Sequence, residues 1–346
     1  MIVKKIPILQ GFPDFFTVKI LSNSKNELSE FNPIFYDIET TGLSRFTSFL
    51  YLIGAVKWEE NSWFLYQWMA EKPQEESIVL ETFSRFLKGA SCTVQYNGNR
   101  FDQPYLEERF RQNEIDSPFG EIPAIDIYQL LKPYQSLLKL SRMKQPDMEE
   151  FMHLPSRRYC DGGKCIRLYR SYMKKAEESV AETLMGHNQE DLLGLGQILN
   201  LLKYRCFFQG EFEIKKINCH EQELTICLDL PYEVPIAFSN SVPEMYLTVS
   251  GQEARLLIHL KDGKLKQHYS NYKDYEYIPG EDMAITKALS RYMDKSLKRP
   301  ATLENCYTWF ECNEVFLADK QKQKQYLEHT FTYFLNMLKK TWNSKK

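Results

Sequence analysis

The chain has 346 residues, of which 43% are apolar and 14% aromatic, enough for two packed domains or one large one. Its formal net charge of −2 excludes a globally basic nucleic-acid-binding protein, so any contact with nucleic acid has to come from local patches. The longest apolar run, 49–56, is far shorter than the roughly 20 residues that cross a bilayer. Scattered cysteines and a start without a charged-then-apolar segment lead us to expect a cytoplasmic protein with no membrane partner.

The first part of the chain predicts a mixed sheet covered by helices, because three strand-like runs come in succession before helices and strands alternate. Residues 1–29 predict an irregular, strand-poor lead-in. The expected strands are 33–39, 50–56, 63–68, 92–96 and 122–127, and the expected helices are 75–88 and 103–112, followed by mostly helical chain over 130–202.

Past about residue 205 the pattern changes to short alternating strands with polar turns between them. The strands expected there are 212–217, 223–228, 246–249 and 254–258, followed by helices at 280–297 and 323–338. We therefore expect an α/β domain over 30–205 and a second, smaller α+β domain over 206–346.

Two acids, Asp37 and Glu39, interrupt the first apolar strand. Side chains at positions i and i+2 of a strand point to the same face, so both carboxylates lie side by side. Such a pair is costly unless a cation lies between the acids, and a hard divalent ion with oxygen ligands fits that position. A solvated surface strand with two acids is the alternative. The polar turn 40–42 that follows lets the backbone approach whatever the acids hold.

Further polar residues recur where the chain leaves a strand or lines a helix. Asn97 and Asp102 lie in the loop after the strand 92–96, and Asp102 has the alternative role of an N-cap of the next helix. His187 and Asp191 are four residues apart and share one helical face, which is also the spacing of an ordinary surface pair. Only partners elsewhere in the chain decide between these roles.

Taken together, these stretches resemble the DEDD superfamily of 3′→5′ exonucleases, which has a ribonuclease H-like fold. The resemblance rests on Asp37-Ile38-Glu39, on Tyr96-Asn97-Gly98 followed by Phe101-Asp102, and on the segment 186–193, and it covers about 30–203. The last segment, with Leu168-Tyr169 upstream, is more specifically similar to the bacterial YprB-like ribonuclease H-like proteins. The histidine branch of the superfamily spaces its histidine five positions before the last aspartate, whereas His187 stands four before it.

The resemblance implies two divalent cations, Mg²⁺ or Mn²⁺, held roughly 4 Å apart by four carboxylates. Asp37 would bridge both ions, Glu39 and Asp191 would hold the first, and Asp102 would reach the second. His187 would take a proton from the attacking water. The substrate-binding residues implied along the path of the 3′-terminal nucleotide are Thr40, Thr41, Gly42, Leu43 and Asn97, with Leu43 as an apolar wedge.

Residues 130–175 are rich in Lys and Arg, with Arg157 and Arg158 in one of the densest parts, and this pattern favours binding to phosphates of an unpaired strand. A solvated basic helix face is the alternative. The sequence therefore predicts a metal-dependent 3′→5′ exonuclease on single-stranded DNA or RNA, or on nucleic acid with a free 3′ end. The alternatives are a non-catalytic nucleic-acid-binding module on the same fold and a protein-interaction subunit that docks a partner through 206–346.

Overall fold

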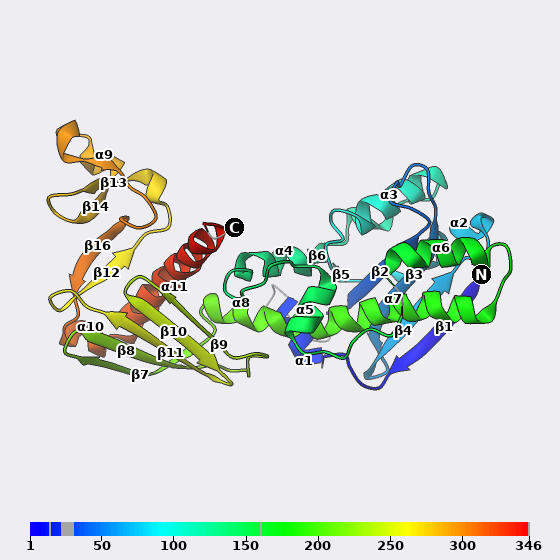
Figure 1. Cartoon of the computed structure of the whole chain (residues 1–346), viewed down its shortest axis with the longest axis horizontal. Helices are drawn as coiled ribbons and strands as arrows, with labels where there is room; N and C mark the ends of the chain where they lie inside the picture. The colour runs from blue at the N-terminus through cyan, green and yellow to red at the C-terminus, as the bar shows by residue number, and fades with distance from the viewer. Residues whose placement is uncertain (14, 22–30, 160, 345–346) are drawn as a thin grey trace. The chain divides into compact units, whose positions relative to one another are not determined.

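The computed structural model describes residues 1–13, 15–21, 31–159 and 161–344. The chain divides into two compact units, which are shown together in Figure 1. Unit 1 comprises 1–130 and 142–200, and unit 2 comprises 131–141 and 201–346. Among the described residues, no helix is both long and apolar enough to cross a membrane.

Unit 1 is built on a six-stranded mixed sheet with the strand order β1-β4-β3-β2-β5-β6. The four strands from β1 to β2 are antiparallel neighbours, whereas β5 and β6 run parallel to β2. The bounds are β1 Ile2–Ile8, β2 Pro33–Thr40, β3 Leu50–Glu59, β4 Ser62–Met69, β5 Cys92–Gln95 and β6 Ala124–Asp126. The mixed sheet expected from the sequence is confirmed.

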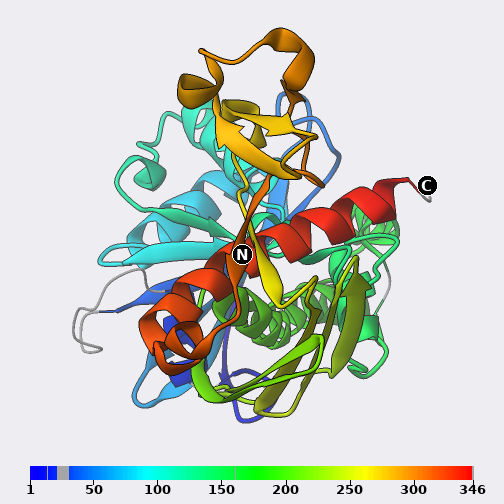
Figure 2. The ribbon, with the colours of Figure 1, turned by 90° about the vertical axis from the view of Figure 1, so that its left-hand side faces the viewer.

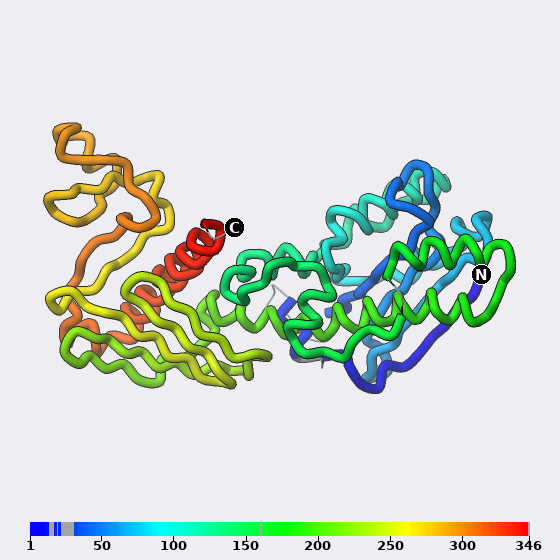
Figure 3. The backbone as a smooth tube through the Cα atoms, viewed as in Figure 1, coloured from blue at the N-terminus to red at the C-terminus, as the bar shows by residue number. Residues whose placement is uncertain are grey.

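The strand β1 corrects the expectation of a strand-poor lead-in over 1–29. It pairs antiparallel with β4 along its whole length, from Ile2 opposite Met69 to Ile8 opposite Trp63. The backbone trace in Figure 3 shows the chain from its N-terminus along this edge of the sheet. Its side chains alternate between half-buried and exposed, as they do in an edge strand with one face on the core. Residues 22–29 of the expected lead-in lie outside the described residues.

Helices cover both faces of this sheet. On one face, Val79 and Phe83 of α2 and Leu106 of α3 pack against Ile34 and Tyr36 of β2. On the other face, α6 and α7 bury side chains against β3 and β4, and α7 also contacts β2 (Figure 1). The helices described in unit 1 are α1 Phe15–Val18, α2 Glu76–Phe86, α3 Asp102–Gln112, α4 Ile127–Leu131 (whose last residue falls in unit 2), α5 Gln145–Phe151, α6 Gly162–Tyr172 and α7 Glu178–Ile198.

Unit 2 is rich in strands, and its main sheet has the order β7-β8-β11-β10-β9. Its strands are β7 Glu213–His220, β8 Glu223–Asp229, β9 Phe238–Val242, β10 Met245–Ser250 and β11 Glu253–His259. Smaller sheets contain β12 Lys264–His268 and β16 Tyr307–Glu311, and β13 Tyr275–Ile278, β14 Met283–Thr286 and β15 Arg299–Pro300. The helices are α8 Leu202–Phe208, α9 Lys287–Ser290, α10 Glu314–Ala318 and α11 Lys320–Asn343, and α11 lies across the main sheet in Figure 2.

The expected helix over 280–297 is wrong. Met283–Thr286 form β14, which pairs with β13, and only Lys287–Ser290 are α-helical. The partner strand satisfies the backbone hydrogen bonds that a helix would have made locally, so tertiary pairing overrides a weak helical pattern.

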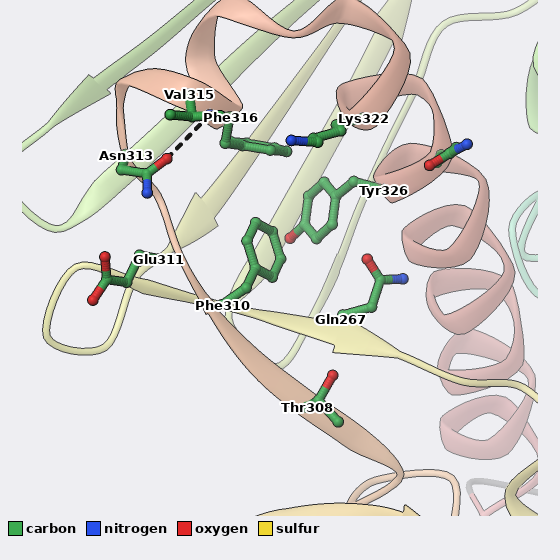
Figure 4. Close-up of a pocket in the computed structure, with 10 residues that line it drawn as sticks. Gln267, Thr308, Phe310, Glu311, Asn313, Val315, Phe316, Lys322 and Tyr326 are labelled. Carbon is green, nitrogen blue, oxygen red and sulfur yellow. Dashed lines mark hydrogen bonds between the residues drawn. The ribbon is translucent and has the colours of Figure 1, made fainter.

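An open pocket of about 490 Å³ lies in unit 2 between β12, β16, α10 and α11 (Figure 4). The rings of Phe310, Phe316 and Tyr326 meet edge to face there, with centroids 5.2–5.6 Å apart. These contacts fix α10 and α11 against the two-stranded sheet, so the aromatic cluster serves as a core of this part of the unit.

A candidate metal centre on the helix-covered face of the sheet

The strand β2 presents Asp37 and Glu39 to the face of the sheet that α7 covers. In the antiparallel register, Asp37 lies opposite Gly54 and Glu39 lies opposite Leu52. Leu52 packs with residues of α6 and α7, which identifies the face. Glu39 is only 7% exposed, so the alternative of a solvated surface strand does not describe this pair.

The helix α7 brings His187 and Asp191 to the same place. The Nε2 atom of His187 lies 3.4 Å from Oε1 of Glu39 and 3.3 Å from Oδ2 of Asp191. The side chain of His187 is buried. His187 and Asp191 are therefore not an ordinary exposed i,i+4 pair, because His187 also faces the carboxylate of Glu39 on β2, 148 positions earlier in the chain.

Asp102 is the first residue of α3 and is buried at 9% exposure. The N-cap position belongs to Phe101, which makes no side-chain capping bond, so the N-cap role considered for Asp102 does not hold. Nearby backbone N–H groups, including that of Ile38 on β2, lower the pKa of the Asp102 carboxyl against the larger effect of its burial. The start of α3 therefore lies beside the strand that carries the first two acids.

Burial raises the pKa of all four carboxyls, and the charge of Asp191 raises it further for the other three. Burial, followed by the charge of Asp191, raises the pKa of both Asp37 and Glu39 well above the usual range. Burial also raises the pKa of Asp102, to about 7, against the opposing effect of nearby backbone N–H groups. The pKa of Asp191 is raised by burial although Arg157 and His187 lower it. Carboxylates this close together ionise only when positive charge lies near them, and a divalent cation supplies that charge.

The donor set fits a hard divalent ion. One ligand atom each from Glu39, His187 and Asp191 lie within 4.8 Å of one another. Carboxylate oxygens are the ligands that Mg²⁺ and Ca²⁺ prefer, and an imidazole nitrogen beside them is also accepted by Mn²⁺. The structure therefore groups three of the five residues that the sequence predicts for the catalytic site, and the charge of Asp191 acts on the carboxyls of the other two, Asp37 and Asp102.

Two further residues, Asn188 and Gln67, hold Asp37 in place and were missed by sequence reasoning. The Nδ2 group of Asn188 donates to Oδ2 of Asp37 at 2.9 Å. Its own Oδ1 accepts from Nε2 of Gln67 at 2.8 Å, and both amides are buried. Asn188 directly follows the candidate histidine, but no signal in the sequence connects Gln67 on β4 with it.

The glycine at position 54 of β3 makes room for this chain of amides. A Cβ atom there would lie 1.9 Å from Oδ1 of Asn188 and 2.6 Å from a methyl carbon of Leu192. Both side chains are fully buried, so neither can move aside without shifting α7.

We expect Gly54→Ala to lower the free energy of unfolding by about 1–3 kcal/mol, the usual cost of overpacking a core. The displaced Asn188 would also release Asp37, so the affinity of the site for Mn²⁺ should fall along with stability. Urea denaturation and a titration with MnCl₂ measure the two effects. Gly120→Ala is the matched control, because a Cβ at Gly120 meets nothing within 4 Å. Equal stability of the two variants would show that α7 adjusts freely.

The residues predicted to line the substrate path lie at the end of β2, in the loop that follows it and in the loop after β5. Thr40 donates to the carbonyl of Gly42 at 2.9 Å, and the side chain of Leu43 is 82% exposed, as an apolar wedge requires. Asn97 has a left-handed backbone, with φ of 59°, and its N–H donates to Asp126 at 2.8 Å. Asp126, at the end of β6, is a further positioning residue that the sequence did not indicate.

The two predicted substrate arginines have different surroundings. The guanidinium of Arg157 is ion-paired with Asp191 and with Glu149, and its side chain is 20% exposed. Arg158 is exposed, and its backbone N–H donates to Glu190 of α7 at 2.7 Å. The segment around both residues thus lies against α7 beside the acids.

Comparison with known proteins bears on the fold of unit 1. Residues 34–203 match the RNase_H superfamily family model. No curated protein matches the chain. Together with the mixed sheet and the helices on both faces, this match identifies unit 1 as a ribonuclease H-like fold. Unit 2 adds a β-rich domain to it.

Solved structures show weaker likenesses. A family B DNA polymerase from the archaeon Pyrobaculum calidifontis has 17% identity and a TM-score of 0.43, and the match covers 51% of this chain and 25% of the polymerase. E. coli exonuclease I, in its zinc-bound complex with single-stranded DNA, has 11% identity and a TM-score of 0.32 over 88% of this chain and 73% of its own. Exonuclease I from Methylocaldum szegediense has 11% identity and a TM-score of 0.32 over 87% and 70%.

Proposed function

We propose that the chain is a metal-dependent 3′→5′ exonuclease that hydrolyses phosphodiester bonds of single-stranded DNA or RNA. The observation that carries the proposal is that Glu39, His187 and Asp191 offer ligand atoms within 4.8 Å of one another, and that the buried carboxyls of Asp37 and Asp102 feel the charge of Asp191. A protein that needed only the fold would gain nothing from four buried acids that repel one another. The ribonuclease H-like fold of 34–203 supports the same reading.

Each residue of the site has a part in this proposal. Asp37, Glu39, Asp102 and Asp191 would hold two ions, either Mg²⁺ or Mn²⁺. Bound ions of this kind activate the attacking water and stabilise the leaving 3′-oxygen. The imidazole of His187 accepts the proton that the water loses, from a position 3.3–3.4 Å from two of the ligand carboxylates.

The loops beside the acids supply the substrate path. The exposed side chain of Leu43 would wedge against the last base of a strand, while Thr40, Thr41, Gly42 and Asn97 line the path with backbone and polar groups. The hydroxyl of Thr41 donates to the carbonyl of Phe49 at 3.3 Å, and this bond fixes the start of the loop against the residue before β3. An apolar wedge suits an unpaired terminal nucleotide, because every base offers a face for stacking.

The proposal is tested with purified protein and end-labelled single-stranded DNA and RNA, in Mn²⁺, in Mg²⁺ and in EDTA. Ladders that shorten from the 3′ end only in the presence of metal are expected. Binding without cleavage in every metal would favour the alternative, a non-catalytic nucleic-acid-binding module. The absence of both binding and cleavage would leave a protein-interaction role, which a partner bound through unit 2 would fulfil.

Arg158 gives a prediction about substrate binding. Each phosphate that a cation neutralises contributes close to one unit to the slope of log K against log salt concentration. We expect Arg158→Ala to make this slope shallower by about one unit, because the side chain is exposed next to the acids. Fluorescence anisotropy of a labelled oligonucleotide at several salt concentrations measures it. Lys88→Ala, an exposed cation beyond the end of α2, is the control, and equal slopes in the two variants would mean that Arg158 is only solvated surface.

A further inference from the structure

The guanidinium of Arg157 joins two acids on different helices. Its Nε and Nη2 groups donate to Oε2 and Oε1 of Glu149, both at 2.7 Å, and its Nη1 group donates to Oδ1 of Asp191. The two parallel bonds to Glu149 fix the plane of the guanidinium, which a lysine ammonium cannot do. The third bond is therefore aimed at Asp191 from a rigid base.

Glu149 is itself held firmly. It lies on α5, which packs on α7, and it is 7% exposed. Gln145, one turn earlier, donates from Nε2 to Oε1 of Glu149 at 3.0 Å and to the backbone carbonyl of Asp191 at 2.6 Å. Glu149 and Arg157 together carry no net charge, so the pair orients Asp191 without adding charge to the site.

The two oxygens of Asp191 are divided between different neighbours. Oδ1 accepts from Arg157, while Oδ2 faces Nε2 of His187 at 3.3 Å, on the side where Glu39 lies. Without the bond from Arg157, the carboxylate of Asp191 could rotate, and its Oδ2 atom would not stay turned toward His187 and Glu39.

We propose that Arg157, anchored by Glu149, is a positioning residue that holds Asp191 so that its Oδ2 atom faces the candidate metal centre; this inference rests on the proposed function. It replaces contact with a phosphate as the main role of Arg157. All three nitrogens of the guanidinium already donate to carboxylates, and the side chain is only 20% exposed, so little of it is left for a phosphate.

The test is Arg157→Lys, because lysine keeps the charge but loses the planar fork. If Arg157 positions Asp191, the affinity for Mn²⁺ should fall roughly 10- to 100-fold, the usual effect of losing a partner that orients a metal ligand. The salt slope of oligonucleotide binding should stay unchanged. If Arg157 instead binds phosphate, lysine should replace it well, and the affinity for Mn²⁺ should stay as in the wild type. Isothermal titration calorimetry with MnCl₂ on the full chain separates these two results.

The matched control is Arg111→Lys. Arg111 makes the same two-bond contact with Glu108 on α3, but its side chain is 70% exposed. Its substitution should leave Mn²⁺ binding unchanged. Circular dichroism and the melting temperature establish that each variant is folded. If Arg157→Lys does not fold, Glu149→Gln takes its place, since the amide weakens the anchor while keeping its shape, and a several-fold loss of Mn²⁺ affinity is expected.

Failure of this inference is distinct from failure of the proposed function. A wild-type chain that binds no Mn²⁺ would overturn the metal centre itself. A wild-type chain that binds Mn²⁺, with Arg157→Lys binding it within twofold, would overturn only the positioning role of Arg157.

Discussion

Replacing Asp37 with asparagine is expected to lower the rate of phosphodiester hydrolysis roughly 10³-fold or more at saturating Mn²⁺, at or beyond the upper end of what losing one electrostatic stabiliser costs. Asp37 is one of the four carboxylates that would hold the ions, and its Oδ2 atom is oriented by Asn188. Asparagine keeps the shape and still accepts that hydrogen bond. The loss would therefore come from the charge and not from the fold.

The same substitution should stabilise the metal-free protein at neutral pH. The folded pKa of Asp37 is raised well above the value of about 3.9 for an unfolded aspartate, so the folded state holds a proton that the unfolded state has lost. Stability then falls as the pH rises from the unfolded pKa to the folded pKa, and it changes no further above that. Asparagine removes this contribution. Urea denaturation in EDTA between pH 4 and pH 8 should show a shallower decline for Asp37→Asn than for the wild type.

A matched control is Asp116→Asn, which changes an exposed aspartate of the same unit. It should keep both wild-type activity and the wild-type pH profile. If the Asp37→Asn variant keeps more than a small fraction of the wild-type rate, the metal site has been assigned to the wrong residues.

The second large effect is expected for His187→Ala, which should lose roughly 10²–10⁴-fold in rate, the usual share of general-base catalysis. Without the imidazole, the attacking water lacks the group proposed to accept its proton, so the loss should appear in the rate at saturating Mn²⁺ and substrate.

A titration with Mn²⁺ separates the role of His187 as a general base from a role as a metal ligand, which the geometry also permits. Nε2 of His187 is close enough to Glu39 and Asp191 to be a metal ligand itself. A base leaves the affinity for Mn²⁺ unchanged when it is removed, whereas a ligand lowers it. His220→Ala, at an exposed position at the end of β7, serves as the control. Wild-type rates in His187→Ala would mean that the histidine only pairs with the carboxylates of Glu39 and Asp191.

Local periodicity explains which parts of the site were predictable. The two-residue repeat of a strand places Asp37 and Glu39 on one face, and the helical repeat does the same for His187 and Asp191. Both groupings are properties of the backbone conformation and hold wherever the elements pack. The strand β1 was missed, and a helix over 280–297 was wrongly predicted, because the local patterns there are weak. Pairing with β4 decided the first segment, and pairing of β14 with β13 decided the second.

The sequence by itself determined the mixed sheet, the order of the three acidic motifs and the faces on which the acids stand. Only the tertiary structure decided that α7 packs on the face of β2 that carries the acids. It also decided that Gln67 is linked to Asp37 through Asn188, and that Arg157 is ion-paired with Glu149 and Asp191. The physical reason is the separation along the chain over which each kind of interaction acts. Periodicity and turn chemistry act over a few residues, whereas these contacts join residues 8 to 151 positions apart, and burial and close packing select them.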